Sequence, residues 1–403
     1  MPIGQKLDIA IAGAGPAGLA AGLSLHRDGH RVRLFERFET ARPTGSGLIL
    51  QPTGQAVMAT LGLLPTIGAL GQPLDRLVGH DARSGRTVLD MRYAKWRGLG
   101  RGLGVHRSAL FGVLHDAVVA ERIEVVTGCT ISGHEPGYLI CGSRREGPFD
   151  LVVDALGATS PLRAMLPQAR APRPLNFGAI WGTVPWVDAG FERTALMQRY
   201  ERASVMIGVL PVGRQSAGGP ELASFFWSLR WREHEALVAD GFESWRERVA
   251  GLWPETVPHL EALGSFDALS LARYQHYTAA SPVTDGLVAV GDAAHSTSPQ
   301  LGQGANMALL DARALTLALR MADVADALAT YAWLRRWHVR LYQALSLWLT
   351  PAYQSESRVL PVLRDLAVPI AATVPPLPQL LAALVAGRLL DPFTALQLEA
   401  VQV

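Results

Sequence analysis

A glycine-rich turn near the start of the chain limits what the chain can fold into more than any other feature. The turn, Gly13-Ala-Gly-Pro-Ala-Gly18, follows an apolar run at residues 7–12 that is typical of a buried strand. Residues 16–27 have a helical pattern that ends at Gly29, and residues 31–36 have the pattern of a second strand. A strand, a helix and a strand within about 30 residues make a βαβ unit. The sequence therefore predicts an α/β fold built on a parallel sheet.

Each glycine of this turn has a physical task in binding a dinucleotide. Gly13 permits the tight turn, Gly15 lets the backbone approach a pyrophosphate, and Gly18 lets the helix pack closely on the strand. The helix opens at Pro16-Ala17, where free N–H groups offer partial positive charge to phosphates. Glu36, at the end of the second strand, can accept hydrogen bonds from two ribose hydroxyls. We therefore predict a Rossmann-like domain that binds a dinucleotide.

A second strand-to-helix junction lies about three-quarters of the way along the chain. Residues 286–290 have a buried-strand pattern and lead into Gly291-Asp292-Ala-Ala-His295, and a short loop then reaches a helical pattern at 305–321. Asp292 is placed to accept hydrogen bonds from a polyol. The backbone N–H groups of Gly302 to Asn306 can stabilise a developing anion. We interpret His295 as a structural residue rather than an acid–base catalyst.

The sequence changes character between the two junctions. Runs at 179–185, 204–210 and 222–231 are rich in β-branched and aromatic residues, which predicts an antiparallel sheet, and residues 233–251 have a helical pattern. The predicted fold class is α/β (α+β overall), with a Rossmann-like domain interleaved with an antiparallel-sheet substrate domain, plus a C-terminal helical segment. The predicted boundaries are 1–75, 98–171 and 281–330 for the first domain, 76–97 and 172–280 for the substrate domain, and 331–403 for the C-terminal segment.

The C-terminal segment is apolar and interrupted by prolines. Residues 330–349 predict an amphipathic helix with three tryptophans, and residues 366–387 carry no charge but hold four prolines. Prolines interrupt the backbone hydrogen bonding that lipid demands, so we expect no transmembrane helix here. We expect the tail to pack back on the first domain or to form a homodimer contact. Contact with a membrane surface or another partner stays open.

Charge and composition exclude other classes of protein. The net charge is +2, with 37 basic and 35 acidic residues and no basic block, so nucleic-acid binding is not expected. The two cysteines, Cys129 and Cys141, have no His or Cys pairs nearby, which argues against a metal site and a disulfide framework. We expect two free thiols in a reducing cytosol. A strand pattern begins almost at once, without a signal peptide, and a cytoplasmic location is expected.

The two junctions together give the chain a resemblance to a known family. It resembles the FAD-dependent aromatic-hydroxylase type of flavoprotein monooxygenases, the para-hydroxybenzoate hydroxylase-like group A enzymes, over roughly residues 7–50, 100–165 and 285–315. The resemblance implies tightly bound, non-covalent FAD and no metal. The residues that it assigns to FAD are Gly13, Gly15, Pro16, Ala17, Gly18, Glu36, Arg37, Arg42, Gly47, Arg107, Leu156, Gly157, Asp292, Gly302, Gly304, Ala305 and Asn306.

One position departs from the family pattern. Family members carry Asp-Gly followed by Ser and Arg, but this chain reads Asp154-Ala-Leu156-Gly157-Ala-Thr-Ser160-Pro-Leu-Arg163. Leu156 stands where the resemblance expects the aspartate that helps FAD and the reduced nicotinamide to bind. With leucine at this position, direct reduction of the flavin by NAD(P)H becomes an open question. Alternatively, Arg163 and backbone contacts hold the loop without the aspartate.

The resemblance also implies a mechanism. NAD(P)H would dock transiently and reduce FAD, and reaction with O₂ would give a C4a-hydroperoxide that hydroxylates or epoxidises an apolar, aromatic or polycyclic small molecule. Pro299, Gly302, Gln303 and Gly304 would lie against the reacting ring. Arg199, Arg202, Arg230 and Arg273 have the pattern of a solvated face rather than of a carboxylate site. Candidate substrate walls are Trp181, Met197, Met206, Phe225, Trp227 and Tyr274.

Three other functions remain open at this point. An oxidase or dehydrogenase would keep the flavin but insert no oxygen. A halogenase is disfavoured because Trp227-Ser-Leu-Arg-Trp231 has the wrong spacing for the Trp-x-Trp-x-Ile-Pro signature of the tryptophan-type enzymes. A non-catalytic FAD-binding partner is suggested only by Leu156.

Overall fold

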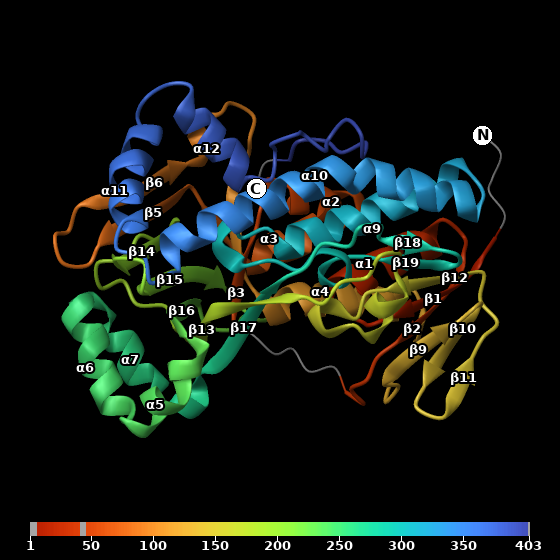
Figure 1. Cartoon of the computed structure of the whole chain (residues 1–403), viewed down its shortest axis with the longest axis horizontal. Coiled ribbons are helices and arrows are strands. Elements are labelled where there is room, and N and C mark those ends of the chain that lie inside the picture. Colours follow the sequence, from red (N-terminus) through yellow and green to blue (C-terminus); the bar gives the residue numbers. More distant parts are fainter. Residues whose placement is uncertain (1–5, 41–45, 402–403) are drawn as a thin grey trace.

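The computed structural model describes residues 6–40 and 46–401, and its largest α/β unit is a six-stranded sheet (Figure 1). Five strands run parallel, and β18 pairs antiparallel with β19 at one edge. This sheet, together with the antiparallel block and C-terminal helices described below, confirms the predicted fold class. In spatial order the strands are β18 (Val283–Thr284), β19 (Leu287–Ala289), β12 (Leu151–Asp154), β1 (Asp8–Ala12), β2 (Arg31–Phe35) and β8 (Glu124–Val126).

Successive side chains of the parallel strands enter two separate cores, as strand alternation requires. Ile9 and Ile11 pack under helices on one face, whereas Ala10 and Ala12 face a small three-stranded sheet on the other. The helices on the first side are α1 (Pro16–Arg27), α2 (Pro52–Thr60), α3 (Leu64–Leu70), α4 (Arg107–Ala120) and α9 (Gly304–Met321).

A seven-stranded sheet forms the second large unit. Most neighbours are antiparallel, as the sequence predicts, but β14 runs parallel to β5, which comes from a segment far earlier in the chain. In spatial order the strands are β17 (Ser270–His276), β13 (Arg173–Pro185), β16 (Leu222–Arg230), β15 (Val205–Gly213), β14 (Ala195–Glu201), β5 (Arg76–Asp81) and β6 (Thr87–Arg92).

Short helices cover the outer face of this sheet. The single helix predicted at 233–251 is wrong: α5 (His234–Ala239) and α6 (Phe242–Leu252) are separated at Gly241. Gly241 has a φ of 90°, a left-handed conformation that a helix cannot contain. A third helix, α7 (Val257–Leu263), completes this layer.

Short 3₁₀ helices occur along the whole chain. They are η1 (Tyr93–Lys95), η2 (Gly157–Thr159), η3 (Pro161–Met165), η4 (Trp231–Glu233), η5 (Pro254–Thr256), η6 (Phe266–Ala268) and η7 (Pro299–Leu301).

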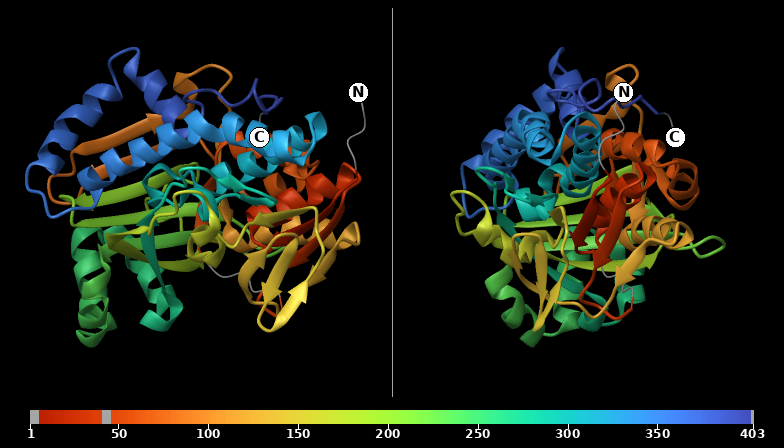
Figure 2. Two further views of the ribbon diagram at one scale, coloured as in Figure 1. Left: turned by 45° about the vertical axis from the view of Figure 1, so that its right-hand side comes forward. Right: turned by 90° about the vertical axis from the view of Figure 1, so that its right-hand side faces the viewer.

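The C-terminal helices gather along one side of the molecule, and all three views show them there (Figures 1 and 2). They are α10 (Val324–Tyr353), α11 (Leu360–Ala371) and α12 (Leu377–Val385). The last residues then return to the core beside α9, as expected for a tail that packs back. In the described part of the chain, no helix is both long and apolar enough to cross a membrane.

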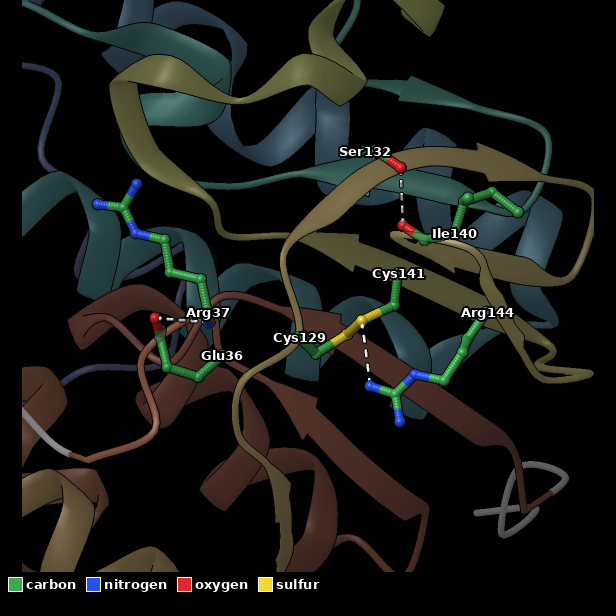
Figure 3. The surroundings of a disulfide bond; sticks show 7 residues. All are labelled: Glu36, Arg37, Cys129, Ser132, Ile140, Cys141 and Arg144. Atoms are coloured by element: carbon green, nitrogen blue, oxygen red, sulfur yellow. Dashed lines mark hydrogen bonds between the residues drawn. A yellow bond between two sulfur atoms is a disulfide. The ribbon is translucent and has the colours of Figure 1, made fainter.

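Two small sheets complete the fold, and one of them overturns a prediction. The first joins the two large units and consists of β3 (Gly47–Leu50), β7 (Gly102–His106) and β4 (Gln72–Leu74). The second is formed by β9 (Ile131–Glu135), β10 (Tyr138–Cys141) and β11 (Arg144–Glu146). Cys129 and Cys141 form a disulfide across it, with Cα atoms 5.4 Å apart (Figure 3). The expectation of two free thiols is therefore wrong, because the β9–β10 hairpin folds the 11 intervening residues back on themselves.

Candidate active site

The turn between β1 and α1 is shaped by close backbone contacts. Gly13 has a φ of +103°, and a Cβ there would lie 2.5 Å from the Ala155 carbonyl oxygen. A Cβ on Gly18 would lie 1.9 Å from the Gly13 oxygen. Both distances are far below van der Waals contact, so only glycine fits at either position. The sequence assigned these two glycines to the turn and to helix packing, and the geometry agrees with both tasks.

Gly15 differs from its neighbours because it faces open space. A Cβ on Gly15 would meet no atom of the described residues within 4 Å. Gly15 is the N-cap of α1 and Pro16 is its first residue, and within residues 6–40 and 46–401 no side chain caps this turn. The free N–H groups at the start of the helix therefore border a space that a phosphate group could occupy.

Glu36 lies beside this turn at the end of β2. Its carboxylate accepts hydrogen bonds from the backbone N–H groups of Ala14, at 3.0 Å, and Arg37, at 2.9 Å. These bonds hold the carboxylate against the turn. Arg37 itself extends outward, its guanidinium 4.6 Å from the centre of the Phe38 ring.

The second junction brings Asp292 next to the start of α9. Asp292 opens the short helix α8 (Asp292–His295), directly after Gly291, whose φ is 59°. A Cβ on Gly304 would lie 3.9 Å from Asp292 Oδ1, so α8 and α9 begin side by side. Burial raises the pKa of the Asp292 carboxyl, and no described residue donates a hydrogen bond to it. A half-buried carboxylate without a donor is placed to receive one from a ligand.

The start of α9 offers backbone donors, while its polar side chains are engaged elsewhere. Gly302 is in the left-handed region at a φ of 60°, and the N–H of Met307 makes the first bond to the Gln303 carbonyl. The amide of Gln303 instead donates to the Val385 carbonyl at the end of α12, at 2.5 Å. Asn306 is fully buried and accepts from the N–H of Gln51 at 2.8 Å. Only the backbone of Gly304 to Asn306 therefore remains for a ligand.

A buried charge network supports the second junction from behind. Asp311 of α9 accepts from Gly291 N at 2.7 Å, from His295 Nε2 at 2.6 Å and from Arg335 Nε at 2.6 Å. Burial alone would raise its pKa, but His295 and Arg335 outweigh burial and lower the pKa of Asp311 to about 2. His295 is 4% exposed, so this geometry agrees with the structural role expected for it.

Arg163 ties the second junction to the loop that follows β12. Its guanidinium donates to the carbonyls of Ala293, at 2.9 Å, and Ala158, at 2.7 Å, and also to the Asp292 carbonyl. Gly157 lies in this loop with a φ of 77°, in η2. Arg163 thus holds together two loops that are far apart in the sequence.

Leu156 leaves the loop without a carboxylate at the position where the family pattern has one. The nearest acid, Asp154, is buried at the end of β12 and accepts from Ser160 Oγ at 2.6 Å and Leu156 N at 3.1 Å. Burial raises the pKa of Asp154 to about 6. Asp154 therefore stabilises the loop from the protein interior. It does not replace the carboxylate that the family pattern has at position 156, on the surface of the loop.

Arg107 opens α4 and has no ion pair with any described residue. Burial raises the pKa values of Asp292 and Tyr274, and the charge of Arg107 offsets part of that rise in both. Gly47 instead packs β3 against the seven-stranded sheet, where a Cβ would lie 2.3 Å from Val212. Gly47 therefore has a packing role, and its contact with FAD stays a prediction. Arg42 lies outside the described residues.

The six predicted substrate residues divide between opposite faces of the seven-stranded sheet. Trp181, Met206 and Tyr274 lie on the face toward the first domain, and Trp181 Nε1 donates to Tyr274 Oη at 2.9 Å. Met197, Phe225 and Trp227 belong to the core under α6 and α7. A single wall made of all six residues is therefore wrong. A strand that is apolar on both faces, such as 222–229, does not reveal which face is turned toward the first domain.

Comparison with known proteins identifies the family. Residues 6–103 and 148–340 match the family model described as an FAD binding domain. The chain is 30% identical over 341 residues to 6-methylpretetramide 4-monooxygenase from Streptomyces rimosus, covering 80% of this chain and 78% of that protein. The chain belongs to the FAD-dependent monooxygenases. Aurachin C monooxygenase/isomerase from Stigmatella aurantiaca is 28% identical over 335 residues, covering 81% of this chain and 84% of that protein.

A solved structure extends the match to the whole fold of this monooxygenase. The tetrameric form of 2-methyl-3-hydroxypyridine-5-carboxylic acid oxygenase superposes with a TM-score of 0.80 at 22% identity, covering 97% of this chain and 98% of that chain. This likeness confirms the fold, in which the seven-stranded sheet faces the FAD domain. The alternative without oxygen insertion is not favoured by these relatives.

Sequence reasoning missed several residues of this monooxygenase that face its FAD domain. The Phe226 ring lies tilted against Trp181, with ring centres 4.5 Å apart, and Gln198 contacts Met206 Sδ at 3.3 Å. His106 is 3% exposed and contacts Thr183 Oγ1 at 2.9 Å. Alternation along β13 and β16 would have grouped Trp181 with Phe226, once their pairing was known.

A cleft of about 350 Å³ opens elsewhere, between α10 and the loop that precedes β18. Its walls include Trp333, Arg336 and Arg340, and none of the residues predicted to bind FAD.

Proposed function

We propose that this monooxygenase uses FAD, NAD(P)H and O₂ to hydroxylate or epoxidise an apolar aromatic or polycyclic small molecule. One observation carries the substrate class. The side of the seven-stranded sheet that faces the FAD domain presents Trp181, Phe226, Met206 and Tyr274, together with uncharged polar groups. Such a surface suits a flat apolar molecule, held by stacking and oriented by a few hydrogen bonds.

We assign the adenosine and pyrophosphate parts of FAD to the first junction. The open space at Gly15 and the uncapped start of α1 suit a pyrophosphate, and Glu36 suits a ribose. Glu36 would exchange its present backbone partners for ribose hydroxyls, or share its oxygens between them. Gly13 and Gly18 act on FAD only through the shape of the turn.

We assign the ribityl chain and the isoalloxazine ring to the second junction. Asp292 supports this assignment because its half-buried carboxylate accepts no hydrogen bond from a described residue. The N–H groups of Gly304, Ala305 and Asn306 would stabilise negative charge on the reduced ring. Arg107, close enough to influence both Asp292 and Tyr274, would stand between the cofactor and the substrate.

The bound flavin supplies the redox chemistry and the activation of O₂. The chain supplies the orientation of the substrate and an environment without water. Tyr274 contributes to orientation because burial raises its pKa to about 12, so the phenol stays protonated and can donate a hydrogen bond at neutral pH. The four arginines considered above as ligands of a substrate carboxylate give no reason to expect a charged substrate. Arg230, for instance, is paired with Glu233, and Arg199 lies 5.1 Å from the Trp253 ring on the far side of the sheet.

Two relatives support the same class of substrate. They are named for 6-methylpretetramide and for aurachin C, and both names describe a monooxygenase. NAD(P)H would reach the flavin transiently, and the lack of a carboxylate at Leu156 predicts a weaker nicotinamide complex. Replacement Leu156→Asp should lower the KM for NAD(P)H, measured by flavin reduction in a stopped-flow instrument. An unchanged KM would mean that Arg163 and the loop backbone suffice.

A cytoplasmic location follows from the use of NAD(P)H, which is a reductant of that compartment. The Cys129–Cys141 disulfide is the observation against it, and fractionation of the native host tests the point directly. We also propose a homodimer as the simplest assembly, which sedimentation equilibrium measures.

The central test is oxygen incorporation. The holoenzyme is mixed with NAD(P)H and a panel of aromatic and polycyclic compounds under ¹⁸O₂. A product that carries one ¹⁸O atom is expected, and NAD(P)H oxidation that yields only H₂O₂ or an unlabelled oxidised product would contradict the proposal.

A matched pair of variants tests which face of the sheet binds the substrate. Phe226→Leu should raise the KM and increase uncoupled H₂O₂ formation. Phe225→Leu, on the opposite face, should lower stability while leaving the KM unchanged. Equal effects on KM would contradict the assignment of the face.

A further inference from the structure

The outer side of the C-terminal helices is unusually apolar for a surface. Twenty large hydrophobic side chains are exposed in the described part of the chain, and nine of them lie within only 22 residues of α11, α12 and their flanks. We call these nine the C-terminal apolar surface. They are Val359, Leu360, Val362, Leu363, Leu366, Ile370, Val374, Leu377 and Leu380.

This exposure does not result from loose packing of the helices. On the inner side of α11, Arg364 is 4% exposed and donates to the carbonyls of Arg202, at 3.0 Å, and Ala352, at 3.1 Å. On the inner side of α12, Ala382 and Val385 are buried against the seven-stranded sheet. The inner contacts fix the rotation of both helices, so the apolar side chains face outward in the folded protein.

The segment that carries this surface has more positive than negative charge, with six arginines and two acids between residues 327 and 390. Both acids are neutralised: Glu356 pairs with Arg230 at 3.2 Å, and Asp365 pairs with Arg364 at 2.8 Å. Three exposed arginines have no ion pair with any described residue. They are Arg336, Arg340 and Arg358.

Helix α10 runs along the same side of the molecule as α11 and α12 (Figures 1 and 2), and it carries three exposed tryptophans. Trp333, Trp337 and Trp348 are 69%, 61% and 81% exposed. Arg336 and Arg340 lie over the Trp337 ring, at 5.2 and 5.6 Å from its centre. Tryptophan and arginine beside aliphatic side chains are the composition favoured at a membrane–water interface.

We propose that the C-terminal apolar surface docks on an anionic lipid bilayer. With 12 and 9 residues, α11 and α12 are too short to span a membrane, so they would lie in its interfacial plane. A second copy of this chain fits less well. A two-fold interface built on this surface would bring the same unpaired arginines toward one another. An anionic lipid bilayer offers negative charge to the unpaired arginines and an apolar interior to the aliphatic side chains.

Docking would place the membrane close to the active site. The end of α12 accepts a hydrogen bond from Gln303, the residue that precedes α9. An apolar substrate dissolved in lipid would then have a short route to the enzyme. The docking itself is independent of the proposed substrate, because it is measured without turnover.

Vesicle flotation of the full-length holoenzyme tests the proposal. We expect flotation with vesicles of phosphatidylcholine and phosphatidylglycerol, and at least about 10-fold weaker binding to phosphatidylcholine alone. The double variant Leu363→Glu/Ile370→Glu should bind the anionic vesicles more than about 10-fold less well, because two apolar side chains that would be buried in the bilayer are lost. Arg336→Glu/Arg358→Glu should abolish the preference for anionic lipid.

The matched control is Val119→Glu/Val238→Glu, which changes two exposed aliphatic residues outside this surface and should bind like the wild type. All variants must retain bound FAD, which reports on folding. A wild type that floats with neither vesicle, or a double variant that floats equally well, would overturn the proposal. A wild-type dimer without vesicle binding, which Leu363→Glu/Ile370→Glu converts to a monomer, would show that a second copy covers the surface.

Discussion

The two junctions of this monooxygenase reach similar shapes by different means. At the first, the shape is set by backbone contacts that only glycine permits, and Gly13 and Gly18 contact each other within one short turn. At the second, glycine is less constrained by contact: a Cβ on Gly302 would lie 3.7 Å from its nearest neighbour, Gln51 Nε2. There the shape depends on Asp311 and Arg163, whose partners come from distant parts of the sequence.

This difference predicts different responses to mutation. Steric constraint at the first junction should make it sensitive to a single added methyl group. Electrostatic support at the second junction should make it sensitive to the loss of a single charge, and to pH.

Removal of the buried carboxylate behind the second junction should have the largest effect. Asp311→Asn leaves Arg335, which is 2% exposed, without its counter-charge. We expect a loss of about 3–5 kcal/mol in the free energy of unfolding, measured with urea. Glu121→Gln, which breaks the exposed pair with Arg27, is the control and should cost about 1 kcal/mol or less. Equal losses in both variants would contradict the supporting role of the network.

Methyl groups added at the first junction should separate folding from binding. Gly18→Ala should destabilise the protein by about 3 kcal/mol, because its Cβ would meet the Gly13 oxygen. Gly15→Ala should leave the stability of the FAD-free protein unchanged within about 0.5 kcal/mol and weaken FAD binding. Urea unfolding and titration with FAD measure the two quantities. A stable Gly18→Ala variant would show that the turn relaxes more easily than the contacts imply.

The carboxyl groups of Asp154 and Asp311 should give opposite pH dependence. Because burial raises the folded pKa of Asp154 to about 6, its contribution to stability is greatest below the unfolded pKa and is lost as pH rises through 6. The stability of the wild type relative to Asp154→Asn should therefore fall by about 2 kcal/mol between pH 4 and pH 7.

Asp311, whose pKa is lowered to about 2, should stabilise the fold fully above its ordinary pKa of 3.8 and lose this effect progressively as the pH falls from there through 2. If the difference in the free energy of unfolding between the wild type and Asp154→Asn stays constant over pH 4–7, burial does not raise the pKa of Asp154 and this account is contradicted.

The smallest expected effect concerns the ligand contact at the second junction. Asp292→Asn should weaken FAD binding about 10-fold, since one charge-assisted hydrogen bond becomes a neutral one. Asp292 faces no described donor, so the stability of the FAD-free protein should not fall. Fluorescence titration with FAD and thermal unfolding measure the two effects, and a large loss of stability with unchanged FAD affinity would contradict the assignment.

The first junction could be predicted from the sequence because its determinants are local. Six consecutive residues hold the turn, and Glu36 follows at the end of the next strand. The antiparallel sheet could also be predicted from strands rich in β-branched and aromatic residues. The predicted substrate domain includes residues 76–97, which hold β5, but the parallel pairing of β14 with β5 could not be predicted, because it joins segments more than 100 residues apart.

Other features depend on three-dimensional contacts that a single sequence does not reveal. Phe225 and Phe226 must point to opposite faces of their strand, but which of the two faces the FAD domain depends on how the sheet packs. The disulfide depends on the β9–β10 hairpin, and the interruption at Gly241 depends on one left-handed residue. Arg335 and Asp311 were not recognised, because a buried ion pair leaves no local pattern when its members lie on different helices.

The central claim is that both junctions hold one FAD molecule, and calorimetric titration of the FAD-free protein tests it most directly. We expect one FAD bound per chain, with affinity lowered by Gly15→Ala at the first junction and by Asp292→Asn at the second. Failure of the folded wild type to bind FAD would contradict the account, as would an affinity that only one of the two variants changes.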